Sequence, residues 1–240
     1  MSLILNIDTA SENAHVSLAK DGLVLHVLSS ASQKEHASFL QTAIQQLTKV
    51  ANINLKEIDA VAVTAGPGSY TGLRVGMASA KGLCYALKIP FITIGTLEVL
   101  TVSALQHYSP AADENILFCP MIDARRKEVF TAIYEHDLNL YLHPCAMILD
   151  EFSFEKELLN NKIIFFGSGS EKWKNVCPHN YRDTNAIFKS VSILPESLSK
   201  SSNNLFLKKK FTDLAYSEPF YLKEFQSVIL TSKNISNKTL

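Results

Sequence analysis

A glycine-rich segment contains the residue types and spacing that point most directly to chemistry. Six of the nine glycines lie between Gly66 and Gly95. Gly66, Gly68 and Ser69 follow an apolar run, and backbone amides exposed at such a turn, beside a helix N-terminus, can hold a phosphate-like anion. The spacing departs from both the dinucleotide-binding pattern and the Walker pattern. These three residues are therefore candidate anion-binding residues outside the common nucleotide motifs.

Close packing is the alternative explanation for the same glycines. Small residues recur at every fourth position: Gly68, Gly72, Gly76, Ala80 and Cys84. On a helix such positions lie along one row, where another helix can approach with little side chain between the two axes. This pattern predicts a close helix–helix contact.

The charges around this predicted helix have one sign. No Asp or Glu occurs between Asp59 and Glu98, whereas Arg74, Lys81 and Lys88 repeat every seven residues and share a face. The face is either solvated or turned toward an acidic partner.

Two aspartates are expected at strand ends. Asp8 follows the mainly apolar residues 3–7, and Asp123 follows residues 116–122. Each carboxylate could orient a metal-bound water or a phosphate, or it could cap a turn. Arg125 and Arg126 could hold a carboxylate or phosphate, or form a surface ion pair with Asp123 or Glu128.

Other catalytic patterns are missing. The seven histidines include no pair three or four residues apart, and no Gly-x-Ser-x-Gly occurs, so neither a helical zinc pair nor a serine-hydrolase elbow is present. We assign no catalytic residue and no metal ligand. The four cysteines are widely spaced and are interpreted as reduced packing residues.

The elements that must position these residues follow from periodicity. Strands are expected at 3–8, 15–19, 23–27, 60–64 and 91–94, with helices at 34–50, from about 71 to 87 and at 97–106. This βββαβαβα order is that of a ribonuclease-H-like half. Strands expected at 116–123, 129–135 and 162–166 indicate a duplicated architecture.

Three segments of the second half leave alternatives open. Gly167-Ser168-Gly169 is either a strand-to-helix turn or an adenosine contact. The polar residues 197–204 predict a loop or a frayed helix end. Lys208, Lys209 and Lys210 are a solvated run or a weak phosphate contact.

Composition excludes several protein classes. The 240 residues carry 23 Lys+Arg and 23 Asp+Glu, and 47% are hydrophobic, so the chain is neither disordered nor collagen-like and has no global basic field for nucleic acid. No apolar run reaches the roughly 18 residues of a membrane helix, and the N-terminus has no cationic region typical of a signal peptide. We expect a cytoplasmic protein.

Five strings together resemble one family over nearly the whole chain. They are LNIDT at 5–9, GPGSYTGLRVG at 66–76, AKGL at 80–83, DARR at 123–126 and EPFYLK at 218–223. The sequence resembles the TsaB (YeaZ) family. The resemblance implies an α/β fold of two ribonuclease-H-like (actin-type) lobes with mixed sheets flanked by helices. We place the lobes at 1–107 and 108–240, with the last segment packing back on the first lobe.

The resemblance also implies a function. Family members take part in threonylcarbamoylation of the tRNA adenosine that follows the anticodon, as non-catalytic partners that scaffold and activate the transferase TsaD. A small ATPase, TsaE, joins the complex. ATP, ADP and metal belong to that complex, tRNA is contacted through it, and the isolated protein is expected to bind no cofactor, to be inactive alone and to form a homodimer. The alternatives are a self-contained ATPase or kinase of the actin-like superfamily and a metallopeptidase-like hydrolase.

The family pairs through helices of its N-terminal lobe, which implies a partner interface on two helices here. In this interpretation Gly72 and Gly76 permit a close crossing, and Leu73 and Met77 are apolar anchors. The implied interface residues are Tyr70, Gly72, Leu73, Arg74, Gly76, Met77, Lys81, His36 and Leu40.

Overall fold

The first half of the chain folds around a five-stranded sheet. The computed structural model describes residues 1–31, 36–108 and 115–222. The strands are β1 (Leu3–Asp8), β2 (Ala14–Lys20), β3 (Leu23–Ser30), β4 (Ala60–Gly66) and β5 (Phe91–Gly95), in the order β3-β2-β1-β4-β5. β1, β2 and β3 pair antiparallel, whereas β4 lies parallel to β1 and β5. The three strands expected at the start of the chain are therefore confirmed, and they form an antiparallel meander.

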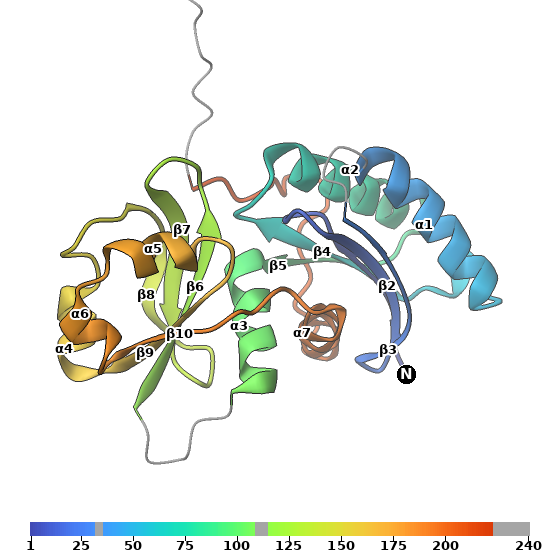
Figure 1. Cartoon of the computed structure of the whole chain (residues 1–240). Coiled ribbons are helices and arrows are strands. Elements are labelled where there is room, and N and C mark those ends of the chain that lie inside the picture. The colour runs from blue at the N-terminus through green and yellow to red at the C-terminus, as the bar shows by residue number, and fades with distance from the viewer. Residues whose placement is uncertain (32–35, 109–114, 223–240) are drawn as a thin grey trace, which may run out of the picture.

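Two helices cover one face of this sheet (Figure 1). They are α1 (His36–Val50) and α2 (Tyr70–Leu87), and the short 3-10 helix η2 (Leu55–Glu57) precedes β4. The apolar side chains of α1 recur three to four residues apart, and Leu40, Ile44 and Leu47 pack against β1, β2 and β4 in one core cluster. This cluster fixes α1 and α2 on the sheet.

The second half repeats the arrangement. Its sheet has the order β10-β9-β6-β7-β8, with antiparallel pairing from β6 to β8 and parallel pairing from β6 through β9 to β10. The duplicated α/β architecture is therefore confirmed. The strands are β6 (Ile116–Asp123), β7 (Glu128–Tyr134), β8 (Leu140–Ile148), β9 (Lys162–Phe166) and β10 (Ala186–Phe188).

Several elements of this half were not predicted. Besides β8 and β10, they are the short helices α4 (Glu155–Asn160), α5 (Ser170–Val176) and α6 (His179–Arg182). α4 to α6 lie on the outer side of the second sheet (Figure 1), where Phe154 and Trp173 are buried against Phe165 of β9. Short helices escape prediction because so few turns carry little periodic signal.

The expectation of a loop or a frayed helix end at 197–204 is wrong, because these residues lie within a regular helix. Residues Pro195–Leu207 form helix α7. Its serines are buried rather than solvated, and the hydroxyls of Ser199 and Ser202 lie 3.2 Å from Asn6 Nδ2 and 2.6 Å from Asn6 Oδ1. This polar helix can be buried because its serine hydroxyls form hydrogen bonds with Asn6, 193 or more positions earlier in the sequence.

α7 and α3 (Thr96–His107) lie between the two sheets (Figure 1). Residues from both sheets and both helices share one core cluster, which includes Ile4, Leu100, Phe118 and Leu198. α7 thus belongs to the second half of the sequence but packs on the first sheet. The lobe boundary at 107/108 stays a prediction.

A segment that we call the C-terminal strap, residues 211–222, follows α7. The Thr212 amide donates to the Phe91 carbonyl over 2.8 Å, and the Phe220 amide donates to the Ala65 carbonyl over 2.7 Å. The strap therefore crosses from the start of β5 to the end of β4.

None of the helices in the described residues is long and apolar enough to cross a membrane.

Candidate functional site

The candidate anion loop is held by contacts within the chain. The Ser69 amide donates to the Ala10 carbonyl over 2.7 Å, and the Ser69 hydroxyl caps α2 by accepting from the Gly72 amide over 3.3 Å. A side chain at Gly68 would collide with the same Ala10 carbonyl. Close packing thus explains this loop, and anion binding at Gly66, Gly68 and Ser69 stays a prediction.

The row of small residues on α2 faces the sheet. A Cβ atom at Gly72 would collide with the Thr9 carbonyl oxygen, and one at Gly76 would collide with the Thr9 hydroxyl oxygen. Thr9 Oγ1 in turn donates to the Gly72 carbonyl over 2.7 Å. The expected helix–helix contact along this row is therefore wrong, because the surface that approaches α2 is the end of β1 and the residue after it.

Burial also corrects the implied interface. Leu40, Leu73 and Met77 are each at most 4% exposed, and Leu40 and Met77 belong to the core beneath α1 and α2. These side chains cannot anchor a partner in this conformation, because they already fill the interior of the first lobe. Gly72 and Gly76 are buried with them.

Other implied interface residues do reach the surface. Tyr70 is 38% exposed, and Arg74, one turn later on α2, is also exposed. The Lys81 ammonium is held by the strap, donating to the Ala215 and Ser217 carbonyls over 3.2 and 2.9 Å. His36 begins α1, and its side chain lies outside the described part of the chain.

Asp8 lies at the end of β1, as expected. The residue is 1% exposed, and its Oδ1 accepts hydrogen bonds from the Thr64 hydroxyl over 2.7 Å and from the Ala10 amide over 3.0 Å. The bond to the amide two positions later is that of a turn cap. Asp8 therefore ties β1 to β4 and shapes the following turn.

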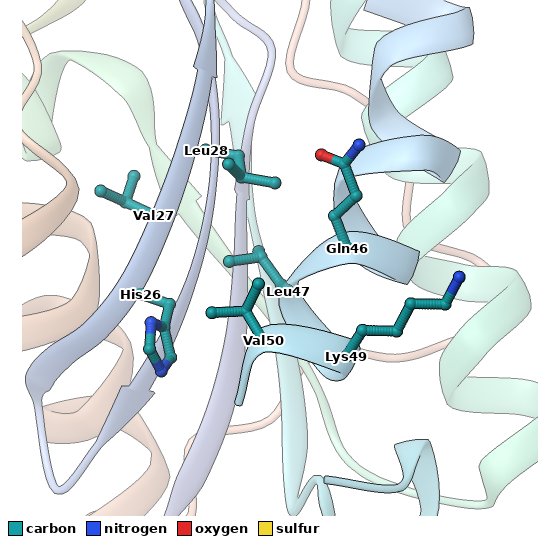
Figure 2. Close-up of a pocket in the computed structure, with 7 residues that line it drawn as sticks. All are labelled: His26, Val27, Leu28, Gln46, Leu47, Lys49 and Val50. Carbon is teal, nitrogen blue, oxygen red and sulfur yellow. The ribbon is translucent and has the colours of Figure 1, made fainter. Parts of the chain in front are cut away.

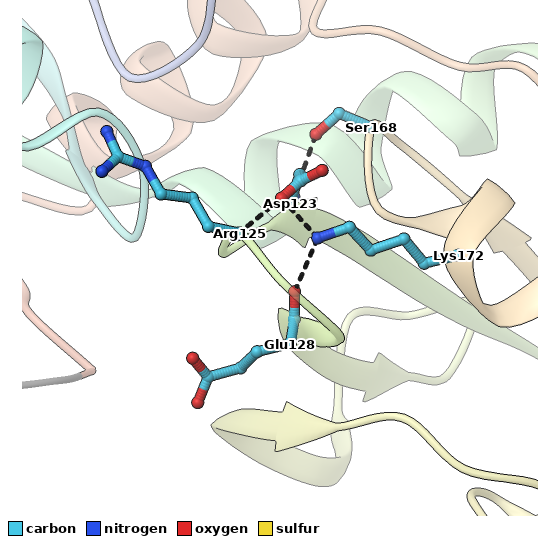
Figure 3. Close-up of polar contacts among 5 residues, drawn as sticks. All are labelled: Asp123, Arg125, Glu128, Ser168 and Lys172. Carbon is cyan, nitrogen blue, oxygen red and sulfur yellow. Dashed lines mark hydrogen bonds and ion pairs between the residues drawn. The ribbon is translucent and has the colours of Figure 1, made fainter.

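Asp123 occupies the corresponding end of β6, where Lys172 of α5 reaches it (Figure 3). The Lys172 ammonium lies 2.5 Å from Asp123 Oδ1 and also donates to the Glu128 carbonyl over 3.2 Å. Because the Lys172 ammonium occupies Asp123 Oδ1, a metal cation would compete with it for this oxygen. The Asp123 amide donates to the Ser168 hydroxyl over 3.1 Å.

The two arginines of the β6–β7 turn do not supply the cation for Asp123. Arg125 donates its backbone amide to Asp123 Oδ1 over 2.6 Å, while its side chain points away from that carboxylate (Figure 3). The suggested ion pair with Asp123 is therefore wrong for Arg125, because Lys172 occupies that position. Arg126 is exposed on the same turn.

Gly167, Ser168 and Gly169 form the turn between β9 and α5, as the first interpretation predicts, and an adenosine contact there stays a prediction. Gly167 has a φ of 91°, and a Cβ there would collide with the Met121 carbonyl oxygen, so the turn requires glycine. The Gly169 amide donates to that carbonyl over 3.0 Å.

The cysteines are free thiols, and three of them are buried. Burial raises the pKa of Cys84 to about 11, although a hydrogen bond with the Val61 backbone acts in the other direction. Burial likewise raises the pKa of Cys119 and of Cys177. These thiols pack and are not reactive at neutral pH, as the sequence predicts.

A cavity of about 290 Å³ opens between β3 and α1, and none of the predicted site residues lines it (Figure 2). Its lining is mainly apolar and includes Val27, Leu28, Leu47 and Val50. Within the described ranges, no three His, Cys, Asp or Glu side chains gather in a group that could hold a metal ion. The absence of a cofactor in the isolated protein stays a prediction.

The sequence did not predict that aromatic residues of the strap lie at the surface. Tyr221 is 40% exposed and its ring centroid lies 5.2 Å from that of Tyr70, while the adjacent Phe220 is 48% exposed. Phe220 and Tyr221 belong to the EPFYLK string, so the run of aromatics after Pro219 was the available signal. Its placement beside α2 depends on the tertiary fold.

The sequence matches a known protein family and individual proteins related to it. Residues 26–217 match the family model described as TsaD, tRNA N6-adenosine threonylcarbamoyltransferase. The chain is 27% identical over 227 residues to the tRNA threonylcarbamoyladenosine biosynthesis protein TsaB of Escherichia coli (strain K12), covering 92% of this chain and 94% of that protein. It is 30% identical over 137 residues to TsaB of Bacillus subtilis (strain 168), covering 57% of each chain.

A solved structure supports the fold. YeaZ from Pseudomonas aeruginosa superimposes with a TM-score of 0.75 at 22% sequence identity, covering 92% of this chain and all of that chain. The family model spans four fifths of the sequence, and the alignment with the E. coli TsaB protein covers 92% of this chain. The chain therefore belongs to the TsaD family and, within it, to the TsaB (YeaZ) proteins.

Proposed function

We propose that this chain is the TsaB-type subunit of the system that makes threonylcarbamoyladenosine in tRNA. The observation that carries the proposal is the alignment with the E. coli TsaB protein, which includes 94% of that protein and both lobes of this one. The alignment with an individual TsaD enzyme covers a smaller share of both proteins. The transferase of Bartonella bacilliformis is 42% identical over 79 residues, which is 33% of this chain and 22% of the enzyme.

A non-catalytic role in this system is supported by the two strand-end aspartates. Asp8 and Asp123 occupy equivalent positions in the two lobes, and each is engaged by its own lobe. Asp8 accepts from Thr64, and Asp123 is paired with Lys172. Because Asp8 ties β1 to β4 and the Lys172 ammonium occupies Asp123, we propose that the chemistry belongs to a TsaD-like catalytic subunit.

The surface that supports pairing is the exposed side of α2. It carries Tyr70, Arg74 and Tyr85, the last 79% exposed, and residues 60–97 contain no carboxylate. Aromatic residues and arginine are enriched at protein interfaces. We propose that this side binds the TsaD-like subunit, or a second copy of the chain when that subunit is missing.

The wider assembly is part of the same proposal. A TsaE-like ATPase joins the complex, tRNA is contacted through it, ATP, ADP and metal are bound by the partners, and the reaction takes place in the cytoplasm. In this proposal the chain scaffolds and activates the transferase.

Reconstitution tests the function. The TsaD-like protein of the same organism, tRNA and the remaining components are incubated with and without this chain, and nucleosides are quantified by mass spectrometry. We expect threonylcarbamoyladenosine only when both proteins are present. Modification that is unaffected by omitting the chain, or ATP or peptide turnover by the chain alone, would contradict the proposal.

A further inference from the structure

The C-terminal strap adds side chains to the surface of α2. Its path is fixed by the bonds from Thr212 to Phe91 and from Phe220 to Ala65, and by Lys81, which reaches two strap carbonyls. The start of α2 and the end of the strap therefore form one continuous surface, although about 150 positions separate them in the sequence.

Three side chains interact on this surface. The Arg74 guanidinium lies 4.8 Å from the centroid of the Tyr70 ring, and the Tyr70 and Tyr221 rings are 5.2 Å apart with their planes at 34°. Burial raises the pKa of Tyr221, and the nearby charge of Arg74 lowers it in part, so the arginine also acts on the strap residue. We call these three residues the arginine cluster.

The arginine cluster is suited to a carboxylate. A guanidinium stacked on an aromatic ring keeps its N–H groups in its own plane, where they can donate two parallel bonds to Asp or Glu. Within the described part of the chain, Arg74 forms no ion pair. Residues 60–97 contain no acidic side chain, and Glu218 of the strap, whose charge acts on Tyr221, forms no ion pair with Arg74 in the described residues.

The contacts favour a protein carboxylate over RNA. Bases bind single-stranded nucleic acid sites by stacking on available aromatic rings, whereas the Tyr70 ring already contacts both Arg74 and Tyr221. The chain also has no net charge to attract a polyanion.

We infer that Arg74, held in position by Tyr70 and by Tyr221 of the strap, binds an aspartate or glutamate of the TsaD-like partner. This inference rests on the proposed function and adds the chemistry of recognition and the role of the strap. Arg74 makes the contact, and Tyr221 is a positioning residue. The strap is thereby part of the partner-binding surface.

Binding of the full chain to the TsaD-like subunit, measured by isothermal titration calorimetry, tests the contact. We expect Arg74→Ala to weaken binding at least about 30-fold, as for a typical interface hot spot. Arg74→Lys should recover only part of this loss, because an ammonium lacks the planar pair of donors. Lys56→Ala is the matched control, since it also removes one exposed positive charge but lies before β4, at the far end of that strand from Arg74.

The positioning role has its own readout. Tyr221→Ala should weaken binding about 2- to 10-fold by releasing the arginine, whereas Tyr221→Phe keeps the ring and should bind normally. In the Arg74→Ala background, Tyr221→Ala should have no further effect. The salt dependence of binding should be smaller for Arg74→Ala than for the unmodified chain.

The outcomes separate this inference from the proposed function. If the unmodified chain fails to bind the TsaD-like subunit, the proposed function fails. If it binds and Arg74→Ala binds equally well, only the arginine contact is overturned. Loss of tRNA binding by Arg74→Ala with normal protein binding would assign the cluster to RNA and also overturn the inference. Equal unfolding temperatures for the variants establish that the losses reflect binding.

Discussion

Thr9 lies directly against two glycines of α2. The Thr9 hydroxyl donates to the Gly72 carbonyl, and both Gly72 and Gly76 lie where a Cβ would collide with Thr9. Glycine in a helix costs about 0.5–1 kcal/mol relative to alanine. Here that cost is offset because α2 can lie directly on the end of β1, which places Tyr70 and Arg74 at the lobe surface.

Alanine at Gly76 should therefore destabilise the protein. The new Cβ would collide with Thr9 Oγ1 and lie 3.4 Å from Val63 Cγ2. Overpacking of this kind costs about 1–3 kcal/mol, which urea denaturation monitored by circular dichroism would measure. A larger substitution at this position, such as Gly76→Leu, would not test partner binding, because the leucine side chain would disturb the fold of the monomer itself.

Gly82 is the matched control on the same helix. A Cβ at Gly82 meets nothing within 4 Å. Gly82→Ala should raise the unfolding free energy by about 0.5–1 kcal/mol, because alanine favours the helix. Equal effects of the two substitutions would show that contact with Thr9 does not determine the choice of glycine at Gly76.

At the scale of elements, α7 shows how a polar helix is buried. Ser197, Ser199 and Ser202 are fully buried, and their hydroxyls find partners on α3 and β1: Ser197 lies 2.9 Å from Ser103, and Asn6 bonds to the other two. A buried hydroxyl without a hydrogen-bond partner would lower the stability of the folded protein. This helix can therefore pack only where its serine hydroxyls meet such partners. The hydrogen bonds specify how α7 packs on the first sheet.

Asn6→Ala tests this packing. The substitution removes the amide that bonds to Ser199 and Ser202, and a buried group left unsatisfied costs about 1–3 kcal/mol. We expect the unfolding free energy to fall by about 2–3 kcal/mol in chemical denaturation. Asn204→Ala, on the exposed side of α7, makes the same chemical change and should be nearly neutral. Similar losses for both variants would show that the buried network contributes little.

At the scale of the whole molecule, α3 links the two lobes by packing against both sheets. Glu98 lies on the first turn of α3, and burial raises the pKa of its carboxyl above the ordinary value of 4.5. The folded protein therefore holds this proton to a higher pH than the unfolded chain does. Stability contributed by Glu98 is present below about pH 4.5 and is lost as the pH rises through the raised pKa.

Glu98→Gln should remove this pH dependence. Denaturation midpoints measured from pH 4 upward should fall less steeply with rising pH for the variant than for the unmodified chain, because glutamine does not titrate. The variant should consequently be the more stable of the two at neutral pH. Parallel curves for the two proteins would show that Glu98 has the same pKa in the folded and unfolded states.

The sequence by itself determined the elements whose signal is local. Alternating or continuous apolar runs located β1 to β5, β6, β7 and β9, and the five strings quoted above were sufficient to indicate the TsaB family. Asp8 and Asp123 were placed correctly at strand ends because a strand and the polar residue that terminates it are neighbours in the chain. The duplication of the α/β unit followed from the same local patterns.

Only the tertiary structure decided which way these elements face and what they contact. Periodicity places Gly72, Gly76 and Ala80 on one side of a helix, but whether that side meets a sheet or a partner depends on residues remote in sequence. Burial of the α7 serines depends likewise on Asn6, and the arginine cluster depends on a strap that returns to α2. In each case the deciding free energy is that of a contact between distant segments, which local propensity does not contain.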